Sequence, residues 1–284
     1  MIKQHASHLV GFFCDTTLVG SGFFGMLQMG LLTACRKEQC ELLIKAVDTH
    51  APDMPIQVQA VLERSPLLGV VLTQPMCDMQ DILDVFFAAG VPVVRIAPRR
   101  EVRTTFDISI DNHRAAYDMT SYLIGLGHKR IAFVKGPADH GDAKERFAGY
   151  CKAMEDAGLP VIEELCVRGS FEFASGVAAG EQLLNIEPPP SAIFACNDEM
   201  AIGVLAAADR LNLRIPEDLS LAGFDDSPLA RMVRPELTTC RQMMELMGYQ
   251  AAEFLINPPA APEARKQLLQ HELVVRQSVA QARG

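Results

Sequence analysis

The sequence lacks the features that mark several large classes of protein. Its eight cysteines include no C-x-x-C pair, so the ligand spacing of a structural zinc site is absent. No stretch reaches the roughly 18 apolar residues of a membrane span. The apolar run that follows MIKQHASH is too short for the core of a signal peptide with a cleavage site. We therefore expect a soluble, cytoplasmic chain, and the sequence leaves open whether an amino-terminal segment has been removed from it.

An excess of basic charge is also missing. The chain carries 26 Lys and Arg against 35 Asp and Glu, which gives a net charge of −9. Domains that grip nucleic-acid phosphates usually carry a basic patch, and anionic membrane surfaces attract basic segments. This balance argues against direct binding of the chain to nucleic-acid phosphates or to an anionic membrane.

Sequence motifs of the common catalytic sites are absent as well. The chain has no Ser-centred elbow, no His-Glu-x-x-His and no phosphate loop with a Lys. The pair Asp225-Asp226 suggests the two carboxylates of a glycosidase, but adjacent side chains at a strand end point apart, and no second acid is identifiable. We expect no enzymatic activity, no cofactor and no metal.

The eight cysteines lie mostly in or beside apolar runs, where a free Cys behaves as a small hydrophobic residue. Disulfide frameworks belong to short secreted chains, and this chain is neither short nor rich in loops. We predict reduced thiols in the core. Cys14 and Cys196 end predicted strands and are therefore expected near the functional site.

What the sequence does contain is a repeated alternation of strands and helices. At 284 residues it is long enough for two domains. Each half, of about 110–130 residues, alternates strand and helix, which predicts an α/β fold of two doubly wound parallel-sheet lobes. The predicted strands are 9–14, 41–47, 69–73, 91–96, 106–110, 130–134, 165–167, 192–195, 219–224 and 270–275, and the predicted helices are 22–37, 56–64, 79–89, 112–126, 143–157, 174–184, 200–211 and 245–256.

The stretch 191–242 predicts a candidate site. Two apolar runs, 192–195 and 219–224, end at Asn197-Asp198 and Asp225-Asp226, and a helix joins them. The strands should therefore be parallel, and ligands of open parallel sheets bind at the carboxyl ends of the strands. Asn197 and Asp225 would face one crevice. The alternative is that Asn197 only caps the helix and that Asp225 only starts a turn.

The run Gly20-Ser21-Gly22-Phe23-Phe24-Gly25 matches the dinucleotide fingerprint letter for letter. A tight turn directly at the strand end is needed for the pyrophosphate to meet the helix N-terminus. Here the five residues 15–19 separate Cys14 from Gly20, and two bulky phenylalanines crowd the turn. A dehydrogenase is therefore disfavoured. We expect Phe23 or Phe24 to cover a ligand or to fill the core.

Seven segments resemble one known family. They are SIDNHRAA (109–116), LGHKRIAFVKGP (126–137), KERFAGYCKAMEDAGLP (144–160), SFEFASG (170–176), SAIFACNDEMAIGVL (191–205), RIPEDLSLAGFDDSPLARMVRPELTTCRQ (214–242) and HELVVRQS (271–278). Together they resemble the core of the lactose-repressor (LacI/GalR) family of bacterial transcription regulators over nearly all of residues 8–280.

The resemblance implies the type I periplasmic-binding-protein fold, with a small effector, usually a sugar, held between two lobes. It places the lobes at 8–111 with 243–268 and at 112–242 with 269–280. It also implies an allosteric homodimer formed through the helices that start near Gly22, Met76 and Glu245. A sugar-binding protein of a transport system would share this fold and is the alternative.

The family's binding residues transfer to positions of this chain by resemblance. Arg146 matches an arginine that bonds sugar hydroxyls or a carboxylate, and Phe171 matches an aromatic that packs on the ligand. Asn197, Asp225 and Gln242 match polar groups that line the cleft. From the residues alone, Arg146 would instead form a surface ion pair with Asp142, one turn earlier.

Departures from the family pattern concern the DNA-reading part and one loop. The family's helix-turn-helix and hinge helix have no match here, so operator DNA is expected to be read by a segment missing from this chain. The usual Pro-Asp…Asn-Pro-Phe-Phe run is replaced by CDTTLVGSGFF (14–24), which includes the candidate contacts Asp15 and Phe23. His140 is a further candidate donor, with a solvated loop histidine as the alternative.

Overall fold

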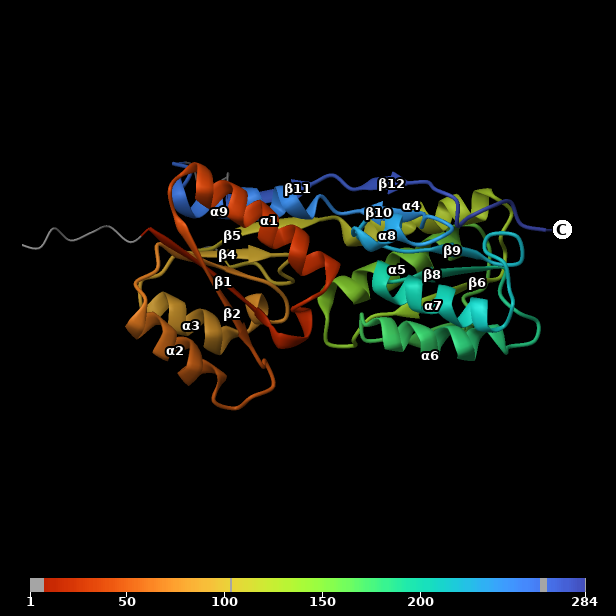
Figure 1. Ribbon diagram of the computed structural model, residues 1–284, viewed down its shortest axis with the longest axis horizontal. Helices are drawn as coiled ribbons and strands as arrows, with labels where there is room; N and C mark the ends of the chain where they lie inside the picture. Colours follow the sequence, from red (N-terminus) through yellow and green to blue (C-terminus); the bar gives the residue numbers. More distant parts are fainter. Residues whose placement is uncertain (1–7, 103, 261–264, 284) are drawn as a thin grey trace, which may run out of the picture. The chain divides into compact units, whose positions relative to one another are not determined.

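A computed structural model of the protein describes residues 8–102, 104–260 and 265–283 (Figure 1). The chain divides into two compact units. Unit 1 comprises Met1–Ser109 and Met243–Leu269, and unit 2 comprises Ile110–Gln242 and Gln270–Gly284. Each unit is therefore assembled from a long segment and a shorter segment from later in the chain.

Unit 1 is built on one sheet in the order β11-β5-β4-β3-β1-β2. The pairs β1·β2, β1·β3, β3·β4 and β4·β5 are parallel, so the chain must cross back between consecutive strands. A helix makes each crossing as far as β4, whereas no described helix lies between β4 and β5. The strands are β1 (Leu9–Asp15), β2 (Glu41–Val47), β3 (Gly69–Leu72), β4 (Val93–Ile96), β5 (Phe106–Ile110) and β11 (Lys266–Leu269). The helices are α1 (Gly22–Lys37), α2 (Met54–Arg64), α3 (Gln80–Ala88) and α9 (Met244–Ile256), with 3-10 turns η1 (Thr16–Leu18) and η2 (Met76–Asp78).

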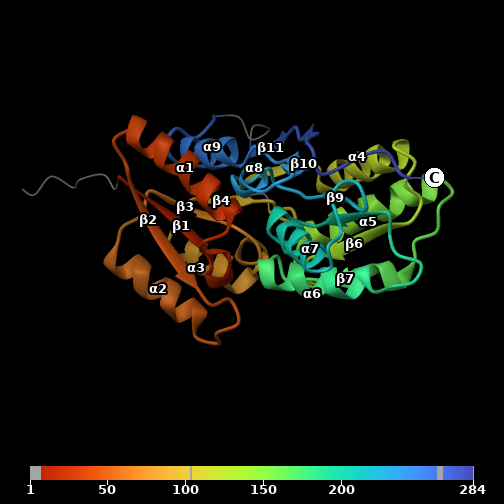
Figure 2. The same cartoon turned by 45° about the vertical axis from the view of Figure 1, so that its right-hand side comes forward.

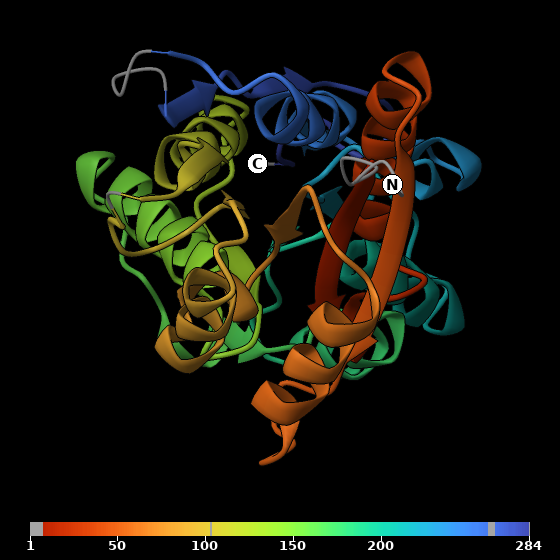
Figure 3. The ribbon, with the colours of Figure 1, turned by 90° about the vertical axis from the view of Figure 1, so that its left-hand side faces the viewer.

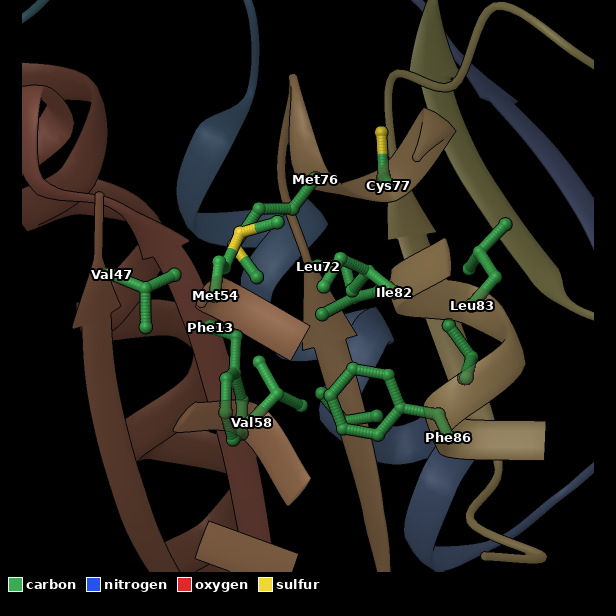
Figure 4. Packing of buried hydrophobic residues seen from close by; sticks show 12 residues of the cluster. Phe13, Val47, Met54, Val58, Leu72, Met76, Cys77, Ile82, Leu83 and Phe86 are labelled. Carbon is green, nitrogen blue, oxygen red and sulfur yellow. The ribbon is translucent and has the colours of Figure 1, made fainter. Parts of the chain in front are cut away.

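Two consecutive phenylalanines of β1 show how both faces of this sheet are covered. Side chains alternate along a strand, so Phe12 and Phe13 point to opposite faces. Phe12 stacks on Phe24 of α1 with ring centroids 5.5 Å apart, and Phe13 meets Phe86 of α3 edge-on at 5.3 Å. Figure 4 shows Phe13 and Phe86 in the cluster that also contains Val58 of α2. In Figure 1, α1 and α9 cover one face of the sheet, and α2 and α3 cover the other.

Unit 2 has a four-stranded parallel sheet in the order β7-β6-β8-β9 and a two-stranded antiparallel sheet, β10-β12. The strands are β6 (Ile131–Lys135), β7 (Cys166–Arg168), β8 (Ala192–Ala195), β9 (Ser220–Ala222), β10 (Thr239–Arg241) and β12 (Glu272–Val274). The helices are α4 (Asn112–Gly125), α5 (Gly141–Asp156), α6 (Phe173–Leu184), α7 (Asp198–Arg210) and the short α8 (Leu229–Met232), with a 3-10 turn η3 (Glu163–Leu165).

Helices in both units pack in pairs on the sheet faces: α1 with α9, α4 with α5, and α6 with α7 (Figures 2 and 3). Glycines permit the close approach. A Cβ on Gly30 of α1 would lie 2.7 Å from the Tyr249 amide nitrogen of α9, and one on Gly203 of α7 would lie 2.6 Å from the Val177 nitrogen of α6. Only a residue without a Cβ leaves room for these backbones to touch.

The predicted α/β architecture of doubly wound parallel sheets is confirmed. The predicted strand 270–275 is present as β12 but covers only Glu272–Val274, and β11 (Lys266–Leu269) in unit 1 was not predicted. Strand β10 and helix α8 were not predicted, since three or four residues are too few to show a period.

All eight cysteines are free, as predicted, and Cys14, Cys35, Cys77, Cys196 and Cys240 are buried. In the part of the chain that the structure describes, no helix is both long and apolar enough to span a membrane.

Candidate ligand-binding site

The carboxyl ends of β8 and β9 bring Asn197 and Asp225 to the same edge of the sheet in unit 2. The strands are parallel, with Phe194 opposite Ala222, so the residues that follow them emerge at one edge. Both side chains are buried, with 5% of Asn197 and 4% of Asp225 exposed. The juxtaposition that the sequence predicted is present.

Asn197 uses its side chain to tie three segments together. Its Oδ1 accepts from the backbone nitrogen of Met200 at 3.0 Å and thereby caps α7. Its Nδ2 donates to the carbonyl of Phe171 at 2.8 Å and to Glu199 Oε2 at 3.0 Å. Asn197 therefore caps α7, but it also holds the Phe171 carbonyl, and a ligand contact at this residue stays a prediction.

Asp225 does more than start a turn. Its backbone has a φ of 118°, a region that non-glycine residues rarely adopt, and its amide nitrogen bonds the Cys240 carbonyl at 2.8 Å. The carboxylate accepts a hydrogen bond from Gln242 Nε2 and lies 3.6 Å from Arg146 Nη1. Burial raises the pKa of Asp225 to about 7, while the charge of Arg146 and the Gln242 hydrogen bond act in the opposite direction.

Arg146 is the cation that faces Asp225 in unit 2. Its Nε donates to Asn112 Oδ1 at 2.8 Å and its Nη1 to the Cys196 carbonyl at 2.7 Å. The guanidinium also lies 3.7 Å from the centroid of the Phe224 ring, a cation–π contact. Only 4% of the side chain is exposed, so the alternative of a surface ion pair is wrong.

Phe171 and His140 form an aromatic pair beside this cluster. Their ring centroids are 5.0 Å apart with planes at 85°, an edge-to-face arrangement. His140 stands at the N-cap position of α5 and is half-buried, which disfavours the alternative of a solvated loop histidine, and its donation to a ligand stays a prediction. Because Asn197 bonds the Phe171 carbonyl, the aromatic pair is physically connected to the strand ends.

Asp226, next to Asp225, faces a different set of groups. Its carboxylate pairs with Arg231 at 3.2 Å, with Arg241 at 2.6 Å and with Arg276. Burial acts to raise the pKa of Asp226, but hydrogen bonds from these arginines lower it below its usual value. The two adjacent acids therefore point apart, as the sequence analysis expected.

Asp198 was missed by the sequence analysis. It is fully buried, and its carboxylate accepts from the Ser227 nitrogen and from Thr239 Oγ1, both at 2.7 Å. Burial, together with the charge of Asp225, raises its pKa well above the usual value. An acid in the first turn of a helix usually complements the helix dipole at the surface, so its position in the sequence carries no sign of burial.

The candidate Asp15 belongs to unit 1 and has internal partners. Its carboxylate accepts from the nitrogen and hydroxyl of Thr17 at 2.8 and 2.5 Å and from those of Thr49 at 3.0 and 2.5 Å. Burial acts to raise its pKa, but these four bonds lower it overall. Asp48 and His50 lie nearby with metal-like spacing, yet the four bonds occupy the oxygens that Asp15 would offer to a cation. A ligand contact at Asp15 stays a prediction.

The glycine run 20–25 is used for local structure. Turn η1 follows β1, and α1 begins only at Gly22, where Ser21 Oγ accepts from the Phe24 nitrogen at 3.1 Å. Phe24 fills the core against Phe12, whereas Phe23 is half-buried in the first turn of α1. The cap already occupies an amide that a dinucleotide phosphate would need, which disfavours a cofactor here.

Comparison with known proteins identifies the family. Residues 120–279 match the model of the periplasmic binding protein-like domain. The ribose operon repressor of Escherichia coli (strain K12) is 40% identical over 271 residues, which cover 95% of this chain and 81% of the repressor. The chain belongs to the LacI family.

Other LacI-family proteins match as well. Catabolite control protein A of Priestia megaterium is 40% identical over 169 residues, 58% of this chain and 50% of that protein. The transcriptional regulator CelR, in its complex with cellobiose, superposes with a TM-score of 0.85 at 28% identity and covers 96% of this chain and 85% of its own. The chain spans about half the length of several of the curated relatives it matches. These LacI-family relatives are named as regulators and repressors, which does not support the dehydrogenase and glycosidase interpretations.

Proposed function

We propose that this chain is the effector-binding part of a LacI-family transcription regulator and that its effector is a small carbohydrate. The observation that carries the proposal is the pairing of two kinds of surface in unit 2. Asp225, Arg146 and Gln242 offer an acceptor and donors for vicinal hydroxyls. Phe171 with His140 offers an aromatic surface for the C–H face of a sugar ring. The ribose operon repressor and the CelR–cellobiose complex carry sugars in their names, which supports the same ligand class.

We further propose that the effector binds between the two units, with Asp15 and Phe23 as contacts from unit 1, and that binding acts allosterically. A ligand that prefers one conformation shifts the population towards it. Operator binding would then be controlled through a DNA-reading segment outside this chain, in a cytoplasmic homodimer. The repressor relatives make this role better supported than that of a transport protein.

Titration calorimetry against a panel that includes ribose, glucose and cellobiose tests the proposal, with NAD as a control. We expect at least one sugar to bind and NAD not to bind. At about pH 8, where Asp225 is mostly ionised, Asp225→Asn should weaken that binding by about 10- to 100-fold, because a hydrogen bond to a charged acceptor contributes about 1.5–3 kcal/mol.

Asp218→Asn is the matched control. It removes a carboxylate of the same unit that is paired with Arg214 at the surface, and the affinity should stay unchanged. Tight NAD binding with no sugar binding would overturn the proposed function. Equal sugar affinity in Asp225→Asn and the wild type would show that the sugar does not bind at Asp225 in unit 2.

A further inference from the structure

The backbone of Phe171 is held in an unusual conformation. Its φ of 66° lies in the left-handed region, which a bulky residue rarely adopts. Such a conformation persists only where neighbouring groups determine it. The loop that carries it is fixed at both sides, because Gly169 bonds the Lys135 carbonyl at 2.8 Å and the nitrogen of Ser170 bonds Ser175 Oγ at 2.9 Å.

The amide of Asn197 holds Phe171 from the backbone side. One N–H donates to the Phe171 carbonyl and the other to Glu199, while Oδ1 caps α7. A primary amide has two N–H donors and two acceptor lone pairs, so both donors of Asn197 are already in use. Its contacts within unit 2 are therefore those of a residue that fixes a loop to a strand end.

Gly136 holds the ring of Phe171 from the other side. A Cβ at Gly136 would lie 2.6 Å from Cζ and 2.7 Å from Cε1 of the Phe171 ring, and 2.8 Å from Ala143 Cβ. The ring therefore packs directly on the backbone that follows β6. The backbone of Gly136 is outside the left-handed region, so space and not conformation requires glycine here.

We propose that Gly136 and Asn197 are positioning residues that fix the Phe171 ring as one wall of the ligand site, for a ligand that presents an apolar C–H ring face. This inference rests on the proposed function. It assigns Asn197 an action through Phe171, beside the direct ligand contact expected from the sequence. A wall that is fixed before binding loses little entropy when the ligand arrives.

Fluorine NMR tests the positioning without any ligand. The chain contains 14 Phe, and after labelling with 3-fluorophenylalanine the resonance of residue 171 is the one that disappears in Phe171→Leu. We expect this resonance to move or broaden in Asn197→Ser and in Gly136→Ala while the others stay in place. Serine is a good N-cap but is too short to reach the Phe171 carbonyl, so Asn197→Ser removes the donor and keeps the cap. A resonance that stays in place in both variants would overturn the proposal.

A double-mutant cycle on sugar affinity tests the consequence for binding. Asn197→Ser should weaken binding by about tenfold in the wild type but by clearly less in a Phe171→Ala background, because the part of its effect that passes through the ring is lost there. Equal losses in both backgrounds would show that Asn197 does not act through the ring and would overturn the proposal.

Matched controls are Asn185→Ser, an exposed asparagine of the same unit, and Gly125→Ala, whose Cβ would meet no atom within 4 Å. Both should leave the resonance and the affinity unchanged. If the wild type binds no sugar in the panel, the proposed function fails, while the NMR result still decides whether Gly136 and Asn197 position the ring.

Discussion

Above about pH 7, where Asp225 is ionised, the guanidinium of Arg146 and the carboxylate of Asp225 form a buried pair in which each charge depends on the other. Removing one partner of such a pair leaves an uncompensated buried charge and costs about 3–5 kcal/mol. We therefore expect Arg146→Met to lower the free energy of unfolding by about that amount. The double variant Arg146→Met/Asp225→Asn should lose less, because neither charge remains. Urea unfolding followed by circular dichroism measures both, and strictly additive losses would contradict the coupling.

The pKa of Asp225 gives the stability a defined pH dependence. In the folded state the carboxyl keeps its proton up to about pH 7, whereas in the unfolded chain it loses it near pH 4. The folded state binds more protons between these values, so the free energy of unfolding falls as the pH rises through this window. In Asp225→Asn the slope of the free energy of unfolding against pH should become less steep, by up to about 1.4 kcal/mol per pH unit. Urea unfolding at several pH values measures the slope, and an unchanged slope would be inconsistent with the buried acid.

Asp226 is the natural comparison, because it is adjacent and its pKa is lowered below the usual value. Its contribution to stability is present above the unfolded pKa and is lost as the pH falls through the folded one. The destabilisation caused by Asp226→Asn should thus be largest near neutral pH and should shrink towards pH 3. The same dependence in both variants would show that the two acids do not differ in environment.

At the scale of elements, two of the three glycines of helix α1, Gly25 and Gly30, have opposite roles. Gly30 lies against the backbone of α9, where a Cβ would be 2.7 Å from the Tyr249 nitrogen, whereas a Cβ at Gly25 would meet no atom within 4 Å. Gly30→Ala should lower the free energy of unfolding by about 1–3 kcal/mol through overpacking. Gly25→Ala should raise it by up to about 1 kcal/mol, the difference in helix propensity. Thermal unfolding of the two variants checks this, and the same sign in both would refute the close packing.

The elements also show what a sequence can and cannot predict. Helix α1 and strand β2 have the predicted bounds, because long periodic segments end at Gly or polar turns that the sequence displays. Strand β10 is only Thr239–Arg241, and it exists because Glu272–Val274 pairs with it from over 30 residues away. A pattern within a few neighbouring residues cannot predict a pairing with a strand so far away in the sequence.

The candidate site likewise combines features that the sequence predicts with features that it cannot show. The ends of β8 and β9 predicted the juxtaposition of Asn197 and Asp225 from strand order alone. Arg146 was assigned only through family resemblance, since its own helix suggested a surface ion pair. The bonds from Arg146 to Asn112 and Cys196 depend on tertiary packing, as does the burial of Asp198. Spacing in the sequence cannot show them.

At the scale of the whole molecule, eight free thiols are distributed over both units, and five of them are buried. Burial raises the pKa of Cys14 to about 12 and that of Cys196 to about 11, so neither forms the reactive thiolate at neutral pH. We expect only Cys40, Cys151 and Cys166, which are half-buried, to react with Ellman's reagent in the folded protein.

The full count of eight should appear after unfolding in urea without any reductant. A triple Cys40→Ser/Cys151→Ser/Cys166→Ser variant provides the matched control. It should show no reaction with the reagent in the folded state, while its five buried thiols should still react after unfolding. Fewer than eight thiols in the unfolded wild type would reveal a disulfide. Rapid reaction of all eight in the folded protein would show that the two cores open far more readily than their burial indicates, since a thiol at 0% exposure reacts only through an opening of the structure around it.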